Sequence, residues 1–340
     1  MLCRLSNQKA KPTNRTTLSM NILANDGISP AGLAALEAAG HRVWTDFVPA
    51  EALAEFINSE NVDGLLVRSA TKVREPLIDA CPDLKFIIRG GVGMDNIDVA
   101  YARSKGVQVN NTPAASSQSV AELVMGHLFT LCRFLHDSNR RMPVEGGEQF
   151  KALKKAYGKG RELRGMTLAI VGFGRIGQSL AQYALGCGMK VIGVDQNTGT
   201  HALAVDIAGQ QISVDIPLVT LDEALTTADA MSLHIPAQAD GQAVIDAEAI
   251  AKMKPGALLL NAARGGVVDE DAMLEALDSG QLGGAGVDVF VGEPKPRLDV
   301  IRHPRVSLTP HVGAATGAAQ ERIGLEIAQI VQEISAKQPA

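Results

Sequence analysis

Residues 167–195 read TLAIVGFGRIGQSLAQYALGCGMKVIGVD, and this stretch decides the fold of the chain around it. An apolar run from Leu168 to Val171 predicts a strand, and the glycine-rich turn GFGRIG (172–177) follows it directly. A helical pattern and a second apolar run, Val191–Val194, then lead to Asp195. Strand, glycine turn, helix, strand and acidic residue in this order are typical of a unit that binds a dinucleotide.

The three glycines and the acidic residue have separate roles in such a unit. Gly172 permits a tight turn, Gly174 lets the backbone approach a pyrophosphate, and Gly177 allows close packing of the helix on the strand. The free amides at the start of the helix form the anion site. Asp195 can accept hydrogen bonds from a ribose diol and would repel a 2′-phosphate. The alternative is an ordinary glycine turn, but the complete arrangement favours a cofactor site for NAD rather than NADP.

The bulk properties of the chain limit its class and its partners. Its 340 residues are enough for two domains, and 46% hydrophobic with 20% charged residues is ordinary for a soluble globular protein. A net charge of −5 gives no reason to expect nucleic acid or an acidic membrane as a partner. No apolar stretch approaches the roughly 20 residues that span a bilayer. The four cysteines lack metal-binding spacing, so we expect no metal and a cytoplasmic location.

The first nineteen residues, MLCRLSNQKAKPTNRTTLS, differ from the rest in composition. They are basic, rich in hydroxyl groups and free of acidic residues, which faintly resembles a transit peptide. They contain no apolar core of a secretory signal, and Met20 directly precedes the first strand-like run. An unstructured extension over 1–19, or an upstream start, is the preferred interpretation.

Short apolar runs alternate with helical patterns along the rest of the chain. In the first part we expect strands at 21–24, 42–45, 64–67, 86–88 and 107–109, with helices near 30–39, 50–58, 75–80 and 96–104. A long helix is expected at 116–138, and a connection or arm at 142–160. Later strands are expected at 230–234, 257–261, 284–288 and 306–308, and a last helix at 317–336. This order predicts the α/β class, with two doubly wound parallel-sheet domains and an active-site cleft between them.

Arg264, Glu293 and His311 follow three of the later strands, where such sheets bind their ligands. A guanidinium can hold a carboxylate through two parallel hydrogen bonds. An imidazole can exchange a proton with a hydroxyl group, and a carboxylate bonded to that imidazole fixes its tautomer. This set suits hydride transfer on a 2-hydroxy or 2-oxo acid, with the redox chemistry supplied by a nicotinamide.

Each of these residues also has a purely structural interpretation. Arg264 could pair with a nearby acid, and Glu293 could be a solvated loop carboxylate. His234 also ends a strand and competes with His311 for the acid/base role, and residue chemistry alone favours His311 only slightly. His127, within the expected long helix, is expected to be a packing or surface residue.

Six segments of the chain resemble the NAD-dependent D-2-hydroxyacid dehydrogenases, and the resemblance extends over essentially everything from Asn21 onward. They are RSATKV (68–73), GGVGMDNID (90–98), GFGRIG (172–177), NAARGGVVDE (261–270), GVDVFVGEP (286–294) and TPHVGAAT (309–316). Their fixed order makes the resemblance specific. Within the family, RSATKV and DNID (95–98) are most similar to the D-3-phosphoglycerate dehydrogenase branch, which begins serine biosynthesis.

The resemblance implies roles for individual residues. The catalytic triad would be Arg264 on the substrate carboxylate, His311 as acid/base and Glu293 as its partner, where formate dehydrogenases carry glutamine. The implied cofactor contacts are Val92, Gly172, Gly174, Arg175, Ile176, Gly177, Asp195, Ile235, Pro236, Ala262, Ala263, Arg264, Asp288, His311, Gly313 and Ala314. The implied substrate-binding residues are Arg68, Ser69, Arg89, Arg264 and His311.

The resemblance also implies an architecture and an assembly. A flavodoxin-like substrate domain would comprise 20–113 plus 309–340, and a Rossmann NAD-binding domain would comprise 114–308. The NAD-binding domains would pair through the long helix, which gives a homodimer. The chain stops after its last helix without the regulatory domain of longer relatives, so we expect no feedback inhibition by serine.

The expected reaction is oxidation of D-3-phosphoglycerate to 3-phosphohydroxypyruvate, because Arg68, Lys72 and Arg89 could meet a phosphate. Ser116 stands where phosphoglycerate dehydrogenases often have asparagine, and this weakens the substrate assignment. One alternative is a reductase of hydroxypyruvate, glyoxylate or another 2-oxo acid. An alternative of another class is an NAD-sensing binding protein similar to a corepressor.

Overall fold

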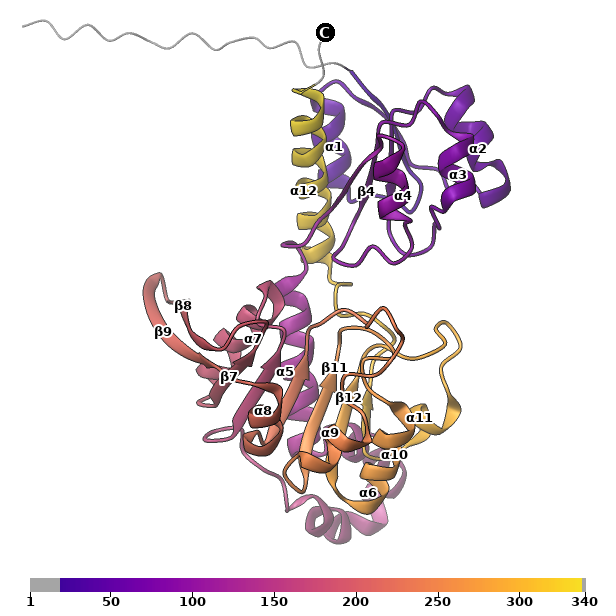
Figure 1. Cartoon of the computed structure of the whole chain (residues 1–340). Helices are drawn as coiled ribbons and strands as arrows, with labels where there is room; N and C mark the ends of the chain where they lie inside the picture. Colours follow the sequence, from indigo (N-terminus) through magenta and orange to yellow (C-terminus); the bar gives the residue numbers. More distant parts are fainter. Residues whose placement is uncertain (1–18, 338–340) are drawn as a thin grey trace, which may run out of the picture. The chain divides into compact units, whose positions relative to one another are not determined.

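The structure, a computed structural model, describes residues 19–337, and the chain divides into two compact units (Figure 1). Of the described residues, 19–112 and 321–337 form the first unit, and Pro113–Gln320 form the second. The extension expected over 1–19 lies almost wholly outside the described residues. Among the described helices, none combines the length and the apolar character that a membrane crossing requires.

The first unit is a five-stranded parallel sheet in the order β2-β1-β3-β4-β5, covered by helices. This strand order is that of the flavodoxin-like doubly wound fold, which confirms the expected class. The strands are β1 (Asn21–Ala24), β2 (Arg42–Trp44), β3 (Gly64–Val67), β4 (Phe86–Arg89) and β5 (Gln108–Asn111). The helices are α1 (Pro30–Ala38), α2 (Ala50–Ser59), α3 (Glu75–Ala80), α4 (Val99–Ser104) and α12 (Gly317–Ser335).

Two glycines bring the last helix of the chain onto the first. A Cβ atom on Gly32 of α1 would lie 2.6 Å from the Cα atom of Gly324 in α12, so neither position has room for a larger side chain. Figure 1 shows α1 and α12 side by side. This contact joins α12 to the unit that contains β1.

The second unit is an eight-stranded sheet in the order β13-β12-β11-β10-β6-β7-β9-β8. Its strands are β6 (Thr167–Val171), β7 (Lys190–Val194), β8 (Gly199–Ile207), β9 (Gln210–Leu218), β10 (Ala230–Leu233), β11 (Ala257–Asn261), β12 (Leu282–Val287) and β13 (Val306–Leu308). Its helices are α5 (Ser117–Arg133), α6 (Leu135–Tyr157), α7 (Arg175–Gly186), α8 (Leu221–Thr227), α9 (Ala247–Lys252), α10 (Glu270–Ser279) and α11 (Leu298–Arg302). Apolar clusters lie on both faces of the sheet, which explains why its central strands are continuous apolar runs.

An antiparallel hairpin at the edge of this sheet was not predicted. β8 and β9 pair from Gly199↔Leu218 to Ile207↔Gln210, and the turn residues Ala208 and Gly209 have φ angles of 53° and 83°. Positive φ at both central positions is the twist that favours a two-residue hairpin. The strands on either side of a doubly wound crossover are normally joined by a helix, so this segment departs from the parallel pattern.

The expected helix at 116–138 and the expected connection at 142–160 are both corrected by the structure. The first helix ends where Phe134 adopts a left-handed φ of 55°, and α6 continues through most of the segment expected to be a connection. A straight helix of 23 residues would be about 34 Å long. The rings of Phe134 and Tyr157 are nevertheless 6.1 Å apart, so α6 folds back at the non-helical residue Gln149. Strong helix formers on both sides of Gly146 and Gly147 outweigh the low helix propensity of these two glycines.

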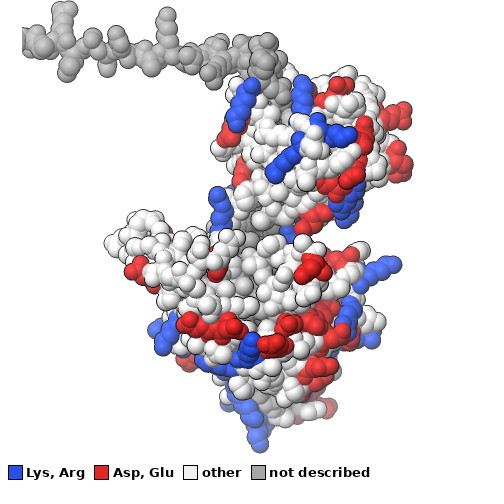
Figure 2. All heavy atoms as spheres, in the orientation of Figure 1, with Lys and Arg blue, Asp and Glu red and all other residues white. Residues whose placement is uncertain are grey.

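The C-terminal boundary between the units also differs from the expected one. Residues 309–320 belong to the second unit, because the carboxylate of Asp288 accepts hydrogen bonds from Thr309, Val312 and Gly313. On the face shown in Figure 2, acidic and basic side chains occur together on each of the two units. In the first unit, Lys105 and Asp79 form an ion pair with 2.6 Å between Nζ and Oδ1.

Candidate active site

Three neighbouring strands of the second unit end in register. Asn261 at the end of β11 pairs with Val287 of β12, which in turn pairs with Leu308 of β13. The loops that follow these strands carry Arg264, Glu293 and His311. Because parallel strands place their carboxyl ends at one edge of a sheet, the three predicted catalytic residues come from adjacent loops.

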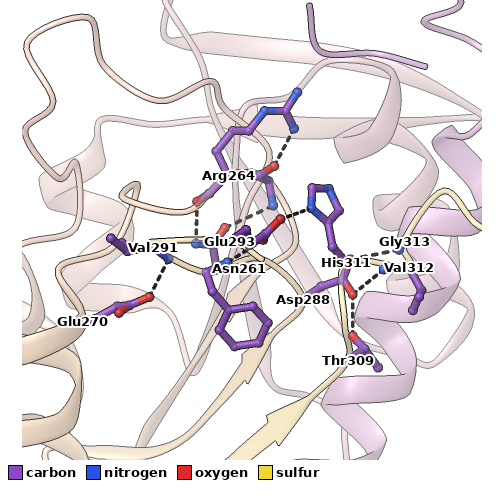
Figure 3. A network of polar contacts seen from close by, with 12 residues as sticks. Asn261, Arg264, Glu270, Asp288, Val291, Glu293, Thr309, His311, Val312 and Gly313 are labelled. Atoms are coloured by element: carbon purple, nitrogen blue, oxygen red, sulfur yellow. Dashed lines mark hydrogen bonds and ion pairs between the residues drawn. The ribbon is translucent and has the colours of Figure 1, made fainter. Parts of the chain in front are cut away.

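The carboxylate of Glu293 holds the ring of His311. Its Oε2 atom lies 2.7 Å from His311 Nδ1, and its Oε1 atom accepts a hydrogen bond of 2.8 Å from the backbone N–H of Phe290 (Figure 3). A carboxylate accepts, so Nδ1 carries a proton and Nε2 is the nitrogen that can exchange a proton with a ligand. The His311 side chain is 51% exposed, which leaves it accessible to a substrate.

Arg264 is held by the strand end that precedes it. Asn261 is buried, and its side-chain amide donates to the carbonyl of Arg264 at 2.9 Å and accepts from the N–H of Ala263 at 3.1 Å. The guanidinium donates a further bond of 2.6 Å to the carbonyl of Ala263. Glu270 stabilises the loop that follows β12 by accepting a hydrogen bond of 2.9 Å from the N–H of Val291. Asn261 therefore fixes the backbone at Ala263 and Arg264, and Glu270 fixes the loop at Val291.

His234, the rival histidine, has a different environment. Its Nε2 atom lies 2.9 Å from the hydroxyl of Ser232, and burial lowers its pKa to about 4. A histidine whose charged form is disfavoured in this way suits packing at the end of β10 rather than proton exchange with a ligand. The geometry therefore favours His311.

The glycine turn matches the needs of a dinucleotide. Gly172 has a φ of 90°, and a Cβ atom there would lie 2.5 Å from the carbonyl oxygen of His234. A Cβ atom on Gly174 would meet no atom within 4 Å, so the space beside the start of α7 is open. Asp195 accepts hydrogen bonds of 2.9 Å from the N–H of Phe173 and 2.8 Å from that of Gln196. These bonds hold the carboxylate beside the turn.

The remaining cofactor candidates lie in two places. Those in the second unit follow the carboxyl ends of its strands or begin α7; they are Arg175, Ile176, Gly177, Ile235, Pro236, Ala262, Ala263, Asp288, Gly313 and Ala314. Val92 belongs to the first unit, after β4, and is 36% exposed. In the described part of the chain, no group of His, Cys, Asp and Glu residues could hold a metal ion.

Two arginines of the first unit occupy neighbouring strand ends. Arg89 closes β4 in register with Val67 of β3, which directly precedes Arg68 and Ser69. The Cγ atom of Arg68 is 3.6 Å from the position of a Cβ atom on Gly90. Lys72, which was expected to meet a phosphate together with these arginines, lines a separate cavity with residues of α2 and α3.

Two residues that support the site were not singled out from the sequence: Asn261, which holds the Arg264 loop, and Thr309, which donates to Asp288. His127, expected to be a packing or surface residue, is buried, and its Nε2 atom lies 3.1 Å from the hydroxyl of Thr309. A polar side chain at the end of an otherwise apolar strand is the signal that could have indicated Asn261. His127 had no such signal, because its partners are remote in the sequence.

Comparison with known proteins agrees with this arrangement. Residues 125–313 match the family model of the D-isomer specific 2-hydroxyacid dehydrogenase NAD-binding domain. A hydroxypyruvate reductase from Thermotoga maritima is 43% identical over 79% of this chain and 83% of its own length. A D-3-phosphoglycerate dehydrogenase from Mycobacterium bovis is 36% identical over 92% of this chain but only 56% of its own length. The chain belongs to the D-2-hydroxyacid dehydrogenase family.

The family relationship extends to solved structures and to the cofactor. The crystal structure of the TT0316 protein from Thermus thermophilus is similar with a TM-score of 0.77 and 30% identity, over 91% of this chain and 94% of that one. The D-2-hydroxyacid dehydrogenases are NAD-dependent oxidoreductases, and NAD is the cofactor that the glycine turn and Asp195 suit.

Proposed function

We propose that this chain oxidises D-3-phosphoglycerate to 3-phosphohydroxypyruvate, reversibly and with NAD, at the start of serine biosynthesis. The observation that carries the proposal is the pair Arg68 and Arg89 at adjacent strand ends of the first unit. Two guanidinium groups suit a phosphate, which a small unphosphorylated oxo acid lacks. The similarity to D-3-phosphoglycerate dehydrogenases over most of the chain supports the same substrate.

NAD would be held by the second unit. The open space at Gly174 and the start of α7 suit the pyrophosphate, and the carboxylate of Asp195 suits the ribose diol. The bound nicotinamide supplies the acceptor or donor of hydride. Ile235, Pro236 and Ala262 follow strands β10 and β11 and would line the remainder of the cofactor site.

The chain's own residues would bind the acid and move one proton. Arg264 would hold the substrate carboxylate through two N–H groups. His311 would take the proton of the 2-hydroxyl on Nε2 during oxidation and return it during reduction. Glu293 would keep the ring in the tautomer that leaves Nε2 free for this exchange, because its carboxylate is bonded to Nδ1.

The test is NADH oxidation with 3-phosphohydroxypyruvate, hydroxypyruvate, glyoxylate and a bulkier 2-oxo acid. We expect the phosphorylated substrate to have the highest kcat/KM. Arg68→Ala should lower kcat/KM at least about tenfold for this substrate and much less for hydroxypyruvate. Lys72→Ala is the matched control, because it removes the same charge from the same loop but from a separate cavity. Equal losses for both substrates in Arg68→Ala would contradict the phosphate assignment.

A second candidate is reduction of hydroxypyruvate, which the 43% identity to a hydroxypyruvate reductase favours. Higher kcat/KM for hydroxypyruvate than for its phosphorylated form would select it. If the chain binds NAD but turns over every 2-oxo acid more slowly than about 1 per second, the result would instead support an NAD-sensing binding protein.

We also propose that the chain forms a homodimer through the second unit. Four large apolar side chains on α6 are exposed, namely Leu135, Met142, Val144 and Phe150. Val144 is 84% exposed, which is unusual for a valine on a folded helix. A group of such residues on one arm indicates a surface that another copy of the chain covers.

A further inference from the structure

A chain of hydrogen bonds runs from helix α5 to the loop that carries His311. His127 is buried, and its ring nitrogens lie 2.8 Å from the hydroxyl of Ser307 and 3.1 Å from that of Thr309. The Thr309 hydroxyl donates to Asp288 Oδ1 at 2.6 Å, and Asp288 is only 1% exposed. Side chains from a helix, a strand and a loop are thus linked in series.

The carboxylate of Asp288, at one end of the series, determines the direction of every hydrogen bond in it. The carboxylate of Asp288 accepts the hydrogen bond that the Thr309 hydroxyl donates, so the oxygen of Thr309 must accept from Nε2–H of His127. His127 Nδ1 then carries no proton and accepts from Ser307. Burial lowers the pKa of His127, which agrees with a neutral ring in this single tautomer.

The other side of Asp288 holds the catalytic loop. Its carboxylate accepts from the N–H of Val312 and of Gly313, both at 2.9 Å, and its backbone carbonyl accepts from the N–H of His311 at 2.8 Å. His311 has a φ of 54°, a region that residues other than glycine adopt rarely and at an energetic cost. The bonds to Asp288 maintain this conformation.

The sheet is shaped to admit His127. A Cβ atom on Gly286 of β12 would lie 2.8 Å from the Cβ atom of His127 and 3.1 Å from its Cγ atom. Glycine at this position therefore lets α5 approach β12 closely enough for the imidazole to reach Ser307 and Thr309. The series is consequently built by both the helix and the strand.

We propose that His127 and Thr309 are positioning residues for the proton exchange at His311. They act through Asp288, which they hold in the orientation that fixes the loop from His311 to Gly313. The inference rests on the proposed acid/base role of His311. It assigns a function to a buried residue of helix α5.

Two matched pairs of substitutions test the inference. Thr309→Val removes the hydroxyl at constant shape, whereas Thr309→Ser keeps it. His127→Asn keeps a polar group only near Nδ1, whereas His127→Gln can still donate from near Nε2. We expect kcat with saturating NADH to fall at least about tenfold in Thr309→Val and His127→Asn, with the KM for the oxo acid nearly unchanged. Thr309→Ser and His127→Gln should recover most of the loss.

The outcomes separate this inference from the proposed function. If the wild type turns over and Thr309→Val and His127→Asn keep its kcat, or lose only thermal stability, the positioning role is wrong. If the wild type reduces no 2-oxo acid, the proposed function has failed. The tautomer of His127 then still tests the hydrogen-bond network that links it to Asp288. Nitrogen-15 NMR of the histidine rings should then show His127 neutral and protonated on Nε2, and protonation on Nδ1 would overturn the inference.

Discussion

At the scale of single residues, burial and hydrogen-bond partners separate the two candidate histidines. His311 is half exposed and is oriented by a carboxylate, while the ring of His234 lies 2.9 Å from the hydroxyl of Ser232 and burial lowers its pKa to about 4. Both follow strands and both stand near a proline, so the sequence alone left them almost equal. The distinction depends on which loop lies opposite each ring, and this is a property of the folded chain.

Arg264 gives the sharpest prediction at this scale. Arg264→Lys should lower kcat/KM at least about 100-fold, because a lysine cannot donate two parallel hydrogen bonds to the substrate carboxylate. Steady-state kinetics of NADH oxidation measures the effect. Arg297→Lys is the control, since Arg297 only pairs with Asp271 and Asp299 at the surface. A value within threefold of the wild type would exclude the carboxylate clamp.

The lowered pKa of His234 predicts that the stability of the protein depends on pH. Its pKa is lowered to about 4 in the folded state from an ordinary value of 6.5, so the unfolded state binds more protons between these values. Stability is therefore retained above about pH 6.5 and decreases as the pH falls towards 4, by about 3 kcal/mol. His234→Gln should lose less thermal stability between pH 7 and pH 4.5 than the wild type in calorimetry. Parallel losses would show that another group is responsible.

At the scale of elements, the glycine turn and α7 depend on close backbone packing. A Cβ atom on Gly177 would contact the carbonyl oxygen of Gly172 and come within 2.9 Å of the side chain of Ile170. Gly186, in the last turn of the same helix, would meet no atom within 4 Å. The close approach of α7 to β6 therefore requires glycine at position 177 but not at position 186.

Matched substitutions in α7 test this requirement. Gly177→Ala should weaken NAD binding at least tenfold and lower the Tm of the second unit, because the helix must move away from β6. Gly186→Ala should leave NAD binding unchanged and raise stability by about 0.5–1 kcal/mol. Calorimetry and titration with NAD measure both effects. Wild-type affinity in Gly177→Ala would contradict the packing argument.

Prediction of elements succeeded where periodicity was strong. Buried parallel strands such as β6 and β11 are uninterrupted apolar runs, and their bounds were predicted closely. The helical part of α6 was missed because Gly146 and Gly147 resemble a loop, although buried Leu153 and flanking helix formers stabilise it. The β8–β9 hairpin was missed because the α/β pattern favours a helix after β7, and only a few of its side chains are buried.

At the scale of the whole molecule, the two sheets and their strand orders follow from the alternation of strands and helices. The family relationship covers both units, since the similarity to a D-3-phosphoglycerate dehydrogenase extends over 92% of the chain. The sequence could not show which unit contains the segment 309–320, because this depends on the hydrogen bonds that the segment donates to Asp288. Assembly is a property at this scale as well.

The exposed arm α6 predicts the assembly state. Val144→Asp should convert the dimer into a monomer or weaken it at least tenfold, because the charge would enter a desolvated interface. Ile207→Asp is the control, as it places the same charge on another exposed apolar residue, 57% accessible, at the hairpin. Light scattering after size exclusion measures the mass. A wild-type chain that is monomeric at micromolar concentration would refute the proposal.

The tip of the β8–β9 hairpin has a practical consequence. Ala208 and Gly209 form a two-residue turn at the far end of the edge strands, and both are exposed. Exposed turns of this kind usually tolerate inserted peptides. An epitope tag or a fluorescent label attached between these two residues should report on the second unit while leaving the cofactor loops intact.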